Sequence, residues 1–122
     1  MRYIKSNRLM RILKRSEYLR VKQRGTSVAE SGLVIQAAPV ANSSSYLQPR
    51  VGFTVSKRVG NAVKRNRARR RLKSIASDVL PNEGFQAWDY VFIGRLVTLD
   101  RPYDLLLEDA RSALRKIHHK AI

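Results

Sequence analysis

The residues of this sequence with the clearest chemistry are nine lysines and arginines crowded between positions 57 and 73. The stretch reads KRVGNAVKRNRARRRLK and contains no acidic residue. Guanidinium groups bind phosphate well, because their planar fork donates two hydrogen bonds to one anion. The stretch therefore predicts a surface that binds a polyanion.

A helix would sort these side chains onto one face. The apolar residues are spaced by four, three and four positions, which makes one stripe for packing: Ala68, Leu72, Ile75 and Val79. At 100° per residue the opposite face presents Asn66, Arg70 and Lys73, with Arg67 and Arg69 on its flanks.

A solvated surface helix usually mixes both signs of charge and forms ion pairs four residues apart. No acidic residue lies between Glu30 and Asp78, so such pairs cannot form locally. An anion-binding face is therefore favoured over a merely solvated one. The helix start at Gly60 and Asn61 is a weaker signal, since free backbone N–H groups attract phosphate but a plain strand-to-helix turn explains the pair equally well.

No protein-borne nuclease site is indicated, because neither paired carboxylates nor a Ser/His/Asp arrangement occurs in the basic region. His118 and His119 are adjacent and cannot share one helix face, so we interpret them as a frayed basic tail. Trp88 and Tyr90 are expected to pack in the core or at a sheet edge. The chain has no cysteine, which excludes a thiolate metal site.

The charge of the chain is large and uneven. Its 122 residues carry a formal net charge of +16, and residues 31–77 hold ten basic and no acidic residues. A hydrophobic fraction of 43% is typical of a globular protein, here one domain spanning residues 1–122. No apolar run is long enough for a membrane span or a signal peptide, so we expect a cytoplasmic protein. Nucleic acid is the leading polyanion, and an anionic membrane surface is the rival.

The remaining pattern predicts an α/β sandwich. Helices are expected over 16–25, from about 61 to 81–84, and over 102–119, with strands over 33–37, 50–56 and 89–94. The last strand is apolar throughout and is expected to be central. Ser16 would cap the first helix, a left-handed Gly25 would end it, and Pro81 and Gly84 would end the second. The Ser-rich segment 41–45 is expected to be the loop of a hairpin between the first two strands. Residues 1–7 are expected to be extended or poorly ordered.

Residues 50–73, RVGFTVSKRVGNAVKRNRARRRLK, closely resemble the signature of the bacterial ribonuclease P protein family. The core of the match is Arg65-Asn66-Arg67, after Ser56-Lys57, and further similarity extends from about residue 8 to 118. The resemblance implies a two-layer α/β (α+β) sandwich of a small mixed sheet and about three helices, similar to the second domain of ribosomal protein S5. It also implies a left-handed βαβ crossover, against the usual preference.

The resemblance further implies that the protein joins a catalytic RNA and that the complex removes the 5′ leader of precursor tRNA. The chain would then be the protein subunit of an endoribonuclease, with no catalytic residue of its own, and the RNA would position the Mg²⁺ ions. The implied partners are that RNA and precursor tRNA, with no membrane and no DNA.

Carried over by position, the resemblance implies two groups of site residues. RNA would contact Lys57, Arg58, Asn61, Lys64, Arg65, Asn66, Arg67, Arg69, Arg70 and Lys73. The leader would lie in a cleft lined by Tyr18, Gln36, Thr54 and Ser56, with Tyr18 stacked on a base. Many relatives carry aromatic residues where this chain has Lys22 and Gln36, so leader binding here is expected to be more electrostatic.

Three other function classes remain open from the residues alone. A ribosomal or ribosome-assembly protein is the first alternative, since it too would bind RNA through a basic helix. A DNA-binding helix module is disfavoured because no short turn joins two helices. A membrane-active peptide is disfavoured because no bulky apolar face is left free of the core.

Overall fold

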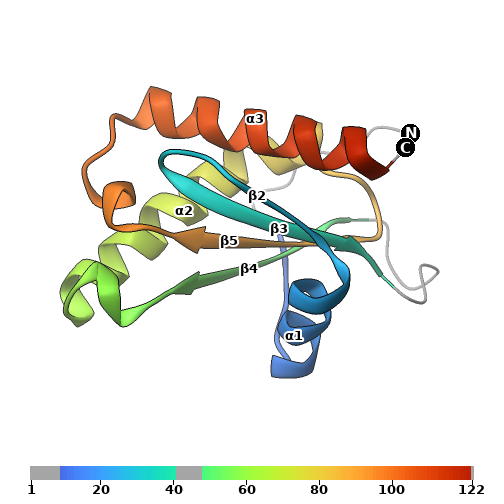
Figure 1. Cartoon of the computed structure of the whole chain (residues 1–122), viewed down its shortest axis with the longest axis horizontal. Helices are drawn as coiled ribbons and strands as arrows, with labels where there is room; N and C mark the ends of the chain where they lie inside the picture. Colours follow the sequence, from blue (N-terminus) through green and yellow to red (C-terminus); the bar gives the residue numbers. More distant parts are fainter. Residues whose placement is uncertain (1–8, 41–47, 122) are drawn as a thin grey trace.

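The computed structural model describes residues 9–40 and 48–121, which form one five-stranded sheet and three helices (Figure 1). The strands are β1 (Met10–Arg11), β2 (Thr26–Ala29), β3 (Leu33–Pro39), β4 (Arg50–Val55) and β5 (Trp88–Gly94). The helices are α1 (Arg15–Arg24), α2 (Ala62–Glu83) and α3 (Tyr103–Ala121), with short 3₁₀ turns η1 (Lys57–Val59) and η2 (Leu96–Leu99). The predicted two-layer α/β class is confirmed, whereas the expectations for residues 1–7 and 41–45 concern segments outside the described residues.

The sheet is mixed, with strand order β1-β4-β5-β3-β2. Strand β5 runs parallel to β4 and antiparallel to β3, and β4 also pairs in parallel with β1. The predicted hairpin between β3 and β4 is wrong, because β5 lies between them. Helix α2 makes the long connection that two neighbouring parallel strands require. The left-handedness of this β4–α2–β5 crossover stays a prediction.

The two faces of the sheet are covered differently. Helices α2 and α3 pack on one face, and α1 lies on the opposite face, from which it projects in Figure 1. Side chains alternate along a strand, so Tyr90 and Phe92 of β5 enter the large core under α2 and α3. Val91 points the other way, into a small cluster with Ile12 and Val21.

Helix α2 follows the predicted pattern closely at its start and less closely at its end. The four residues of its predicted apolar stripe are fully buried. The Asn61 side chain caps the helix by accepting a hydrogen bond of 3.0 Å from the Lys64 N–H. The helix continues through Pro81 to Glu83 and Gly84 is its C-cap, so of the two predicted stop residues Pro81 is wrong and Gly84 is confirmed. Proline costs only one backbone donor there, and its ring is buried against the core.

Helix α1 has different ends from those predicted. Lys14, not Ser16, is the N-cap, and its N–H donates to the Glu17 carboxylate at 3.3 Å. Gly25 follows the helix in an extended conformation with φ −89°, so the expected left-handed cap is wrong. The glycine is needed for space instead, because a Cβ there would lie 2.5 Å from the Ala37 carbonyl oxygen.

The end of α3 packs against the sheet and is not a frayed tail. The His118 ring stacks on Phe85, with ring centroids 3.7 Å apart and planes inclined by 15°. Its Nε2 lies 2.8 Å from the hydroxyl of Tyr90, which also accepts a hydrogen bond from the Phe85 N–H. Trp88 completes this aromatic cluster, which confirms the packing role predicted for Trp88 and Tyr90. Burial lowers the pKa of His118 below its ordinary value.

Candidate nucleic-acid interface

The basic side chains of α2 and η1 form a surface that we call the basic face. Its members are the ten residues predicted to contact RNA, and eight of them are exposed: Lys57, Arg58, Asn61, Lys64, Asn66, Arg67, Arg70 and Lys73. The other two, Arg65 and Arg69, are half-buried. Helix α2, its N-cap and η1 therefore hold all ten on the solvent side, away from the stripe that packs on the sheet.

The basic face is almost free of compensating carboxylates. All nine acidic residues of the chain fall within the described ranges. Of these, only Asp100 lies within ion-pair distance of the basic face, 3.6 Å from Arg67, and both side chains are largely exposed. An exposed pair of this kind contributes ~0–1 kcal/mol. The other ion-paired carboxylates of residues 9–40 and 48–121 contact cations elsewhere.

Two arginines of the basic face are held by hydrogen bonds inside the element. Arg65 Nη1 donates to the Gly60 carbonyl at 2.8 Å, and Arg69 Nη1 donates to Asn66 Oδ1 at 3.0 Å. Each guanidinium keeps further N–H donors for an anion. Arg71, by contrast, lies along the core edge and donates to the Arg101 carbonyl oxygen.

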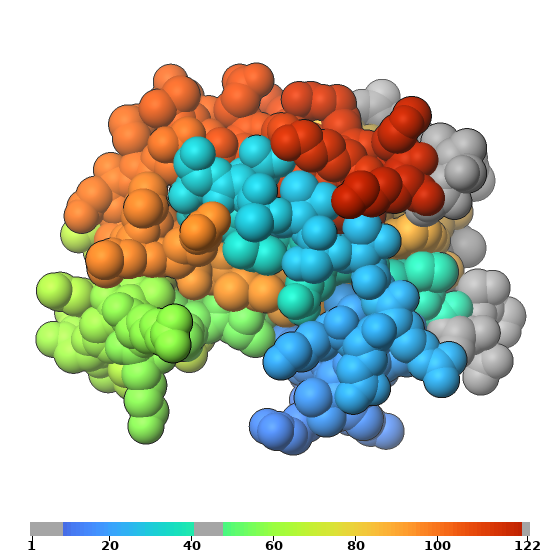
Figure 2. Space-filling model, viewed as in Figure 1, coloured from blue at the N-terminus to red at the C-terminus, as the bar shows by residue number. Residues whose placement is uncertain are grey.

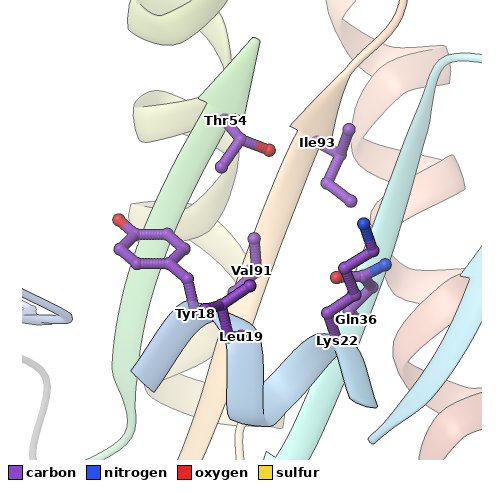
Figure 3. A pocket seen from close by; sticks show the side chains of 7 residues that line it. All are labelled: Tyr18, Leu19, Lys22, Gln36, Thr54, Val91 and Ile93. Atoms are coloured by element: carbon purple, nitrogen blue, oxygen red, sulfur yellow. The ribbon is translucent and has the colours of Figure 1, made fainter. Parts of the chain in front are cut away.

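A pocket of about 300 Å³ opens on the face of the sheet that carries α1 (Figure 3). The register places Gln36, Val91 and Gly52 side by side in one row across β3, β5 and β4. A second row holds Val34, Ile93 and Thr54. Helix α1 supplies the wall, and the lining residues are Tyr18, Leu19, Lys22, Gln36, Thr54, Val91 and Ile93.

The Tyr18 ring forms one end of this pocket because Gly52 lies directly beneath it. A Cβ built on Gly52 would stand 2.5 Å from Tyr18 Cε1 and 2.6 Å from Cζ. Only a residue without a side chain leaves room for the ring to approach the strand so closely. On the other side of Tyr18 lies a second hollow of about 380 Å³, lined by Leu13, Arg15, Tyr18 and Thr54.

The structure brings together three of the four residues predicted to line the cleft. Tyr18, Gln36 and Thr54 share the pocket, and Lys22 joins them. Ser56 does not line it, because the strand has ended and Ser56 is the N-cap of η1. The pocket and the basic face are nevertheless connected, since Thr54 lies three residues before Lys57. Figure 2 shows α1 and the start of α2 projecting from the same side of the molecule with a hollow between them.

Helix α1 is fixed over the sheet by a buried carboxylate that the sequence analysis missed. Asp89 is fully buried and accepts hydrogen bonds from Arg20 at 2.5 Å and from Arg50 at 2.7 and 2.8 Å. Arg50 also pairs with Glu17 of α1 at 2.7 Å. Strand register is the signal that could have revealed this network. Arg50 and Asp89 each stand at the start of a strand, and the two strands are parallel neighbours.

The environment of Glu17 favours its charged form. Burial alone would raise its pKa, but hydrogen bonds from Arg50 and Lys14 and the charge of Arg50 outweigh burial and lower the pKa. The charged form of Glu17 pairs with Arg50 and so links α1 to β4. Among the described residues no group of three or more His, Asp or Glu side chains could hold a metal ion. In the same residues no helix combines the length and apolar character needed to cross a membrane.

Comparison with known proteins gives a consistent result. Residues 7–118 match the family model described as Ribonuclease P. The chain is 49% identical over 111 residues to the ribonuclease P protein component of Paramagnetospirillum magneticum, covering 90% of this chain and 84% of that protein. It is 44% identical over 111 residues to that of Gluconacetobacter diazotrophicus, covering 91% and 93%.

Solved structures show the same fold. The RNase P protein of Staphylococcus aureus superposes with a TM-score of 0.69 at 25% identity, covering 89% of this chain and 95% of that one. The RNase P protein from Thermotoga maritima gives a TM-score of 0.70 at 21% identity, with coverage of 88% and 96%.

Proposed function

Since the chain belongs to the ribonuclease P protein family, we propose that it binds the catalytic RNA of ribonuclease P together with the 5′ leader of precursor tRNA. Family membership makes the chain a protein subunit of ribonuclease P, and so part of an endoribonuclease that contains RNA.

The observation that carries the proposal is the basic face beside a partly apolar pocket. Eight of the ten residues of the basic face are cationic, and a single exposed carboxylate, that of Asp100, lies within ion-pair distance of them. The cations of such a surface repel one another. A phosphate backbone supplies the opposite charge, and binding releases the counterions condensed on the nucleic acid. We assign this surface to the catalytic RNA.

The pocket suits a single-stranded nucleotide better than a duplex. Its floor of Val91 and Ile93 is apolar, and Tyr18 offers an aromatic ring at one end. Proteins bind unpaired nucleotides through such a combination of apolar or aromatic platforms and nearby cations. We assign the pocket to the leader, the unpaired segment that precedes the mature tRNA.

The chemical step is assigned to the RNA. The described residues hold no cluster of carboxylates or histidines that fits a divalent cation, and the proposal places the metal ions on the RNA. In the proposal Mg²⁺ is bound by RNA phosphates in the complex. The protein's own contribution is to position the substrate and to neutralise phosphate charge.

Reconstitution tests the proposed function. Purified protein, the RNA subunit, and both together are incubated with precursor tRNA, and release of the leader is measured. We expect cleavage with both components and none with protein alone. Leader removal by the protein without RNA would overturn the assignment of the chemistry. Ribosomal RNA as the main RNA that co-purifies from cells would favour the ribosomal alternative instead.

A tyrosine variant tests the assignment of the pocket. Tyr18→Ala should weaken binding of leader-containing tRNA to the assembled enzyme by about fivefold or more, because one stacked base contributes ~1–3 kcal/mol. Binding of mature tRNA should be unchanged. Tyr103→Ala is the matched control, since Tyr103 lies on α3 on the other face of the sheet. Equal losses for both tRNAs would remove Tyr18 from the leader site.

A further inference from the structure

A group of exposed apolar side chains lies beside the basic face. Leu96 and Val97, consecutive residues of η2, are 63% and 49% exposed, and Val63 in the first turn of α2 is 75% exposed. We call these three residues the apolar patch. Single exposed apolar residues are ordinary on a protein surface, whereas a group of them rimmed by polar residues marks a contact site.

The chain that follows β5 brings the apolar patch together. Strand β5 ends beside the end of β4, just before η1, and Asp100 lies 3.6 Å from Arg67 of α2. Leu96 and Val97 lie between these points in the chain, so η2 runs along the first turns of α2. Val63 stands one helical turn before Arg67 on the same side of α2. Figures 1 and 2 show η2, in orange, beside the green start of α2.

The turn η2 is attached to the core by its other two residues. Thr98 and Leu99 are buried, and the Thr98 hydroxyl donates a hydrogen bond of 2.5 Å to the Gly32 carbonyl. The turn is therefore held in place without the exposed side chains of Leu96 and Val97. These two side chains are available to a partner, and polar substitutions there should leave the fold intact.

The charges around the apolar patch favour RNA as the partner. Lys64 and Arg67 stand next to the patch on α2, and the basic face continues from there. On the patch itself the Asp100 carboxylate pairs with Arg67 and opposes a phosphate. A base turned out of its stack fits better, because it offers a flat apolar face while its own phosphates stay within reach of the cations.

We propose that the apolar patch binds one unpaired base of the catalytic RNA, turned out from a bulge or loop beside the backbone that the basic face holds. This inference rests on the proposed function, because it adds a base contact to the surface assigned to that RNA. Phosphate contacts position a protein on a nucleic acid but carry no sequence information. The apolar patch would therefore allow the protein to recognise one particular element of its RNA.

A double variant, Leu96→Ser with Val97→Ser, tests this contact. Binding of the RNA subunit is measured over a range of salt concentrations. We expect the affinity to fall by about fivefold or more, the effect of losing one base contact. The slope of log K against log salt should stay unchanged, because no phosphate contact is lost. Leu96→Ser alone should show part of the loss, so the result does not depend on the half-buried Val97.

The matched control is Leu105→Ser. It removes an exposed leucine from α3, outside the apolar patch, and should bind the RNA subunit as the parent protein does. Melting temperatures of all the variants show whether each one is folded.

Chemical probing identifies the base. The RNA subunit is treated with a reagent that modifies unpaired bases, alone and with each protein. One unpaired base should be protected by the parent protein and by Leu105→Ser, and should stay reactive with the double variant. An RNA subunit with an abasic residue at that position should bind the parent protein and the double variant equally.

The outcomes separate this inference from the proposed function. If the double variant gives the affinity and the protection pattern of the parent protein, the inference is wrong and the proposed function stands. A smaller salt slope in the double variant would also overturn the inference, since it would show a disturbed basic face. So would binding to phosphatidylglycerol vesicles that the double variant loses while its RNA affinity is unchanged. A parent protein that does not bind the RNA subunit would overturn the proposed function itself.

Discussion

The close contact between Tyr18 and Gly52 makes two distant positions depend on each other. Gly52→Ala should destabilise the protein by about 1–3 kcal/mol, because the new methyl group overlaps the tyrosine ring and the ring must move. Denaturant unfolding measures the loss. In a Tyr18→Ala background most of that cost should disappear. A cost that is unchanged there would show that the alanine strains the strand itself.

His118 makes stability depend on pH. Its folded-state pKa is lowered by burial, so the unfolded chain takes up a proton at a pH where the folded chain stays neutral. Stability from this group is therefore complete above about pH 6.5 and is lost as the pH falls through the lowered folded pKa. The melting temperature should fall less between pH 8 and pH 5 in His118→Gln than in the parent protein.

The neighbouring histidine provides the control for this pH prediction. His119 is exposed, so His119→Gln should keep the full pH dependence. If the two variants titrate alike, another group is responsible.

At the residue scale the sequence predicted burial well and polar partners poorly. The apolar stripe of α2 could be predicted from the sequence, because residues three or four positions apart lie on one face of a helix and are buried together. The stacking of His118 on Phe85 could not, because it joins residues 33 positions apart. Likewise Tyr18, Gln36 and Thr54 were named through a family resemblance, and only the sheet register shows that they share one pocket.

At the scale of elements, α1 is held at its place by charge as well as by apolar contact. Val21 is its one fully buried side chain, whereas the network of Asp89 with Arg20 and Arg50 links α1, β4 and β5. The pocket wall is therefore positioned by a polar group at the end of the sheet. The apolar periodicity of the α1 sequence could not predict this link, since it depends on the register of β4 and β5.

Removing the central carboxylate should loosen that link. Asp89→Asn is expected to destabilise the fold by about 3 kcal/mol or more, because two partly buried guanidinium groups lose the buried carboxylate that they share, and Arg50 keeps only its pair with Glu17. Thermal or denaturant unfolding measures this. Asp100→Asn, at an exposed pair, should cost about 0.5 kcal/mol or less. Similar losses in the two variants would show that the buried network is not what holds α1.

Strand order was the largest error at this scale. The segments 33–37 and 50–56 look like a hairpin because they are consecutive strands joined by a polar loop. The edge strands β1 and β2 were not predicted, since two and four residues carry too little periodic signal. The central position of β5 was predicted correctly, because a strand apolar on both sides needs cover on both faces.

At the scale of the whole molecule, the uneven charge should control RNA affinity. Arg70→Gln with Lys73→Gln removes two exposed cations of the basic face, which should reduce the slope of log K against log salt by about 1.5–2. Binding of the RNA subunit is measured over a range of salt concentrations. The double variant Arg115→Gln and Lys120→Gln removes the same charge from exposed positions of α3 and should leave the slope nearly unchanged. Equal changes would mean that RNA senses only the net charge.

The place of β5 between β3 and β4 also constrains how the chain acquires its shape during synthesis. The ribosome releases β3 and β4 long before residues 88–94, so both strands wait for their shared neighbour. Only when β5 has emerged can the sheet close, and the pairing then spans some 40 to 60 positions of sequence, which makes a late and slow nucleation step. Nascent chains truncated before residue 88 should therefore be protease-sensitive, and protection should appear once β5 has left the exit tunnel.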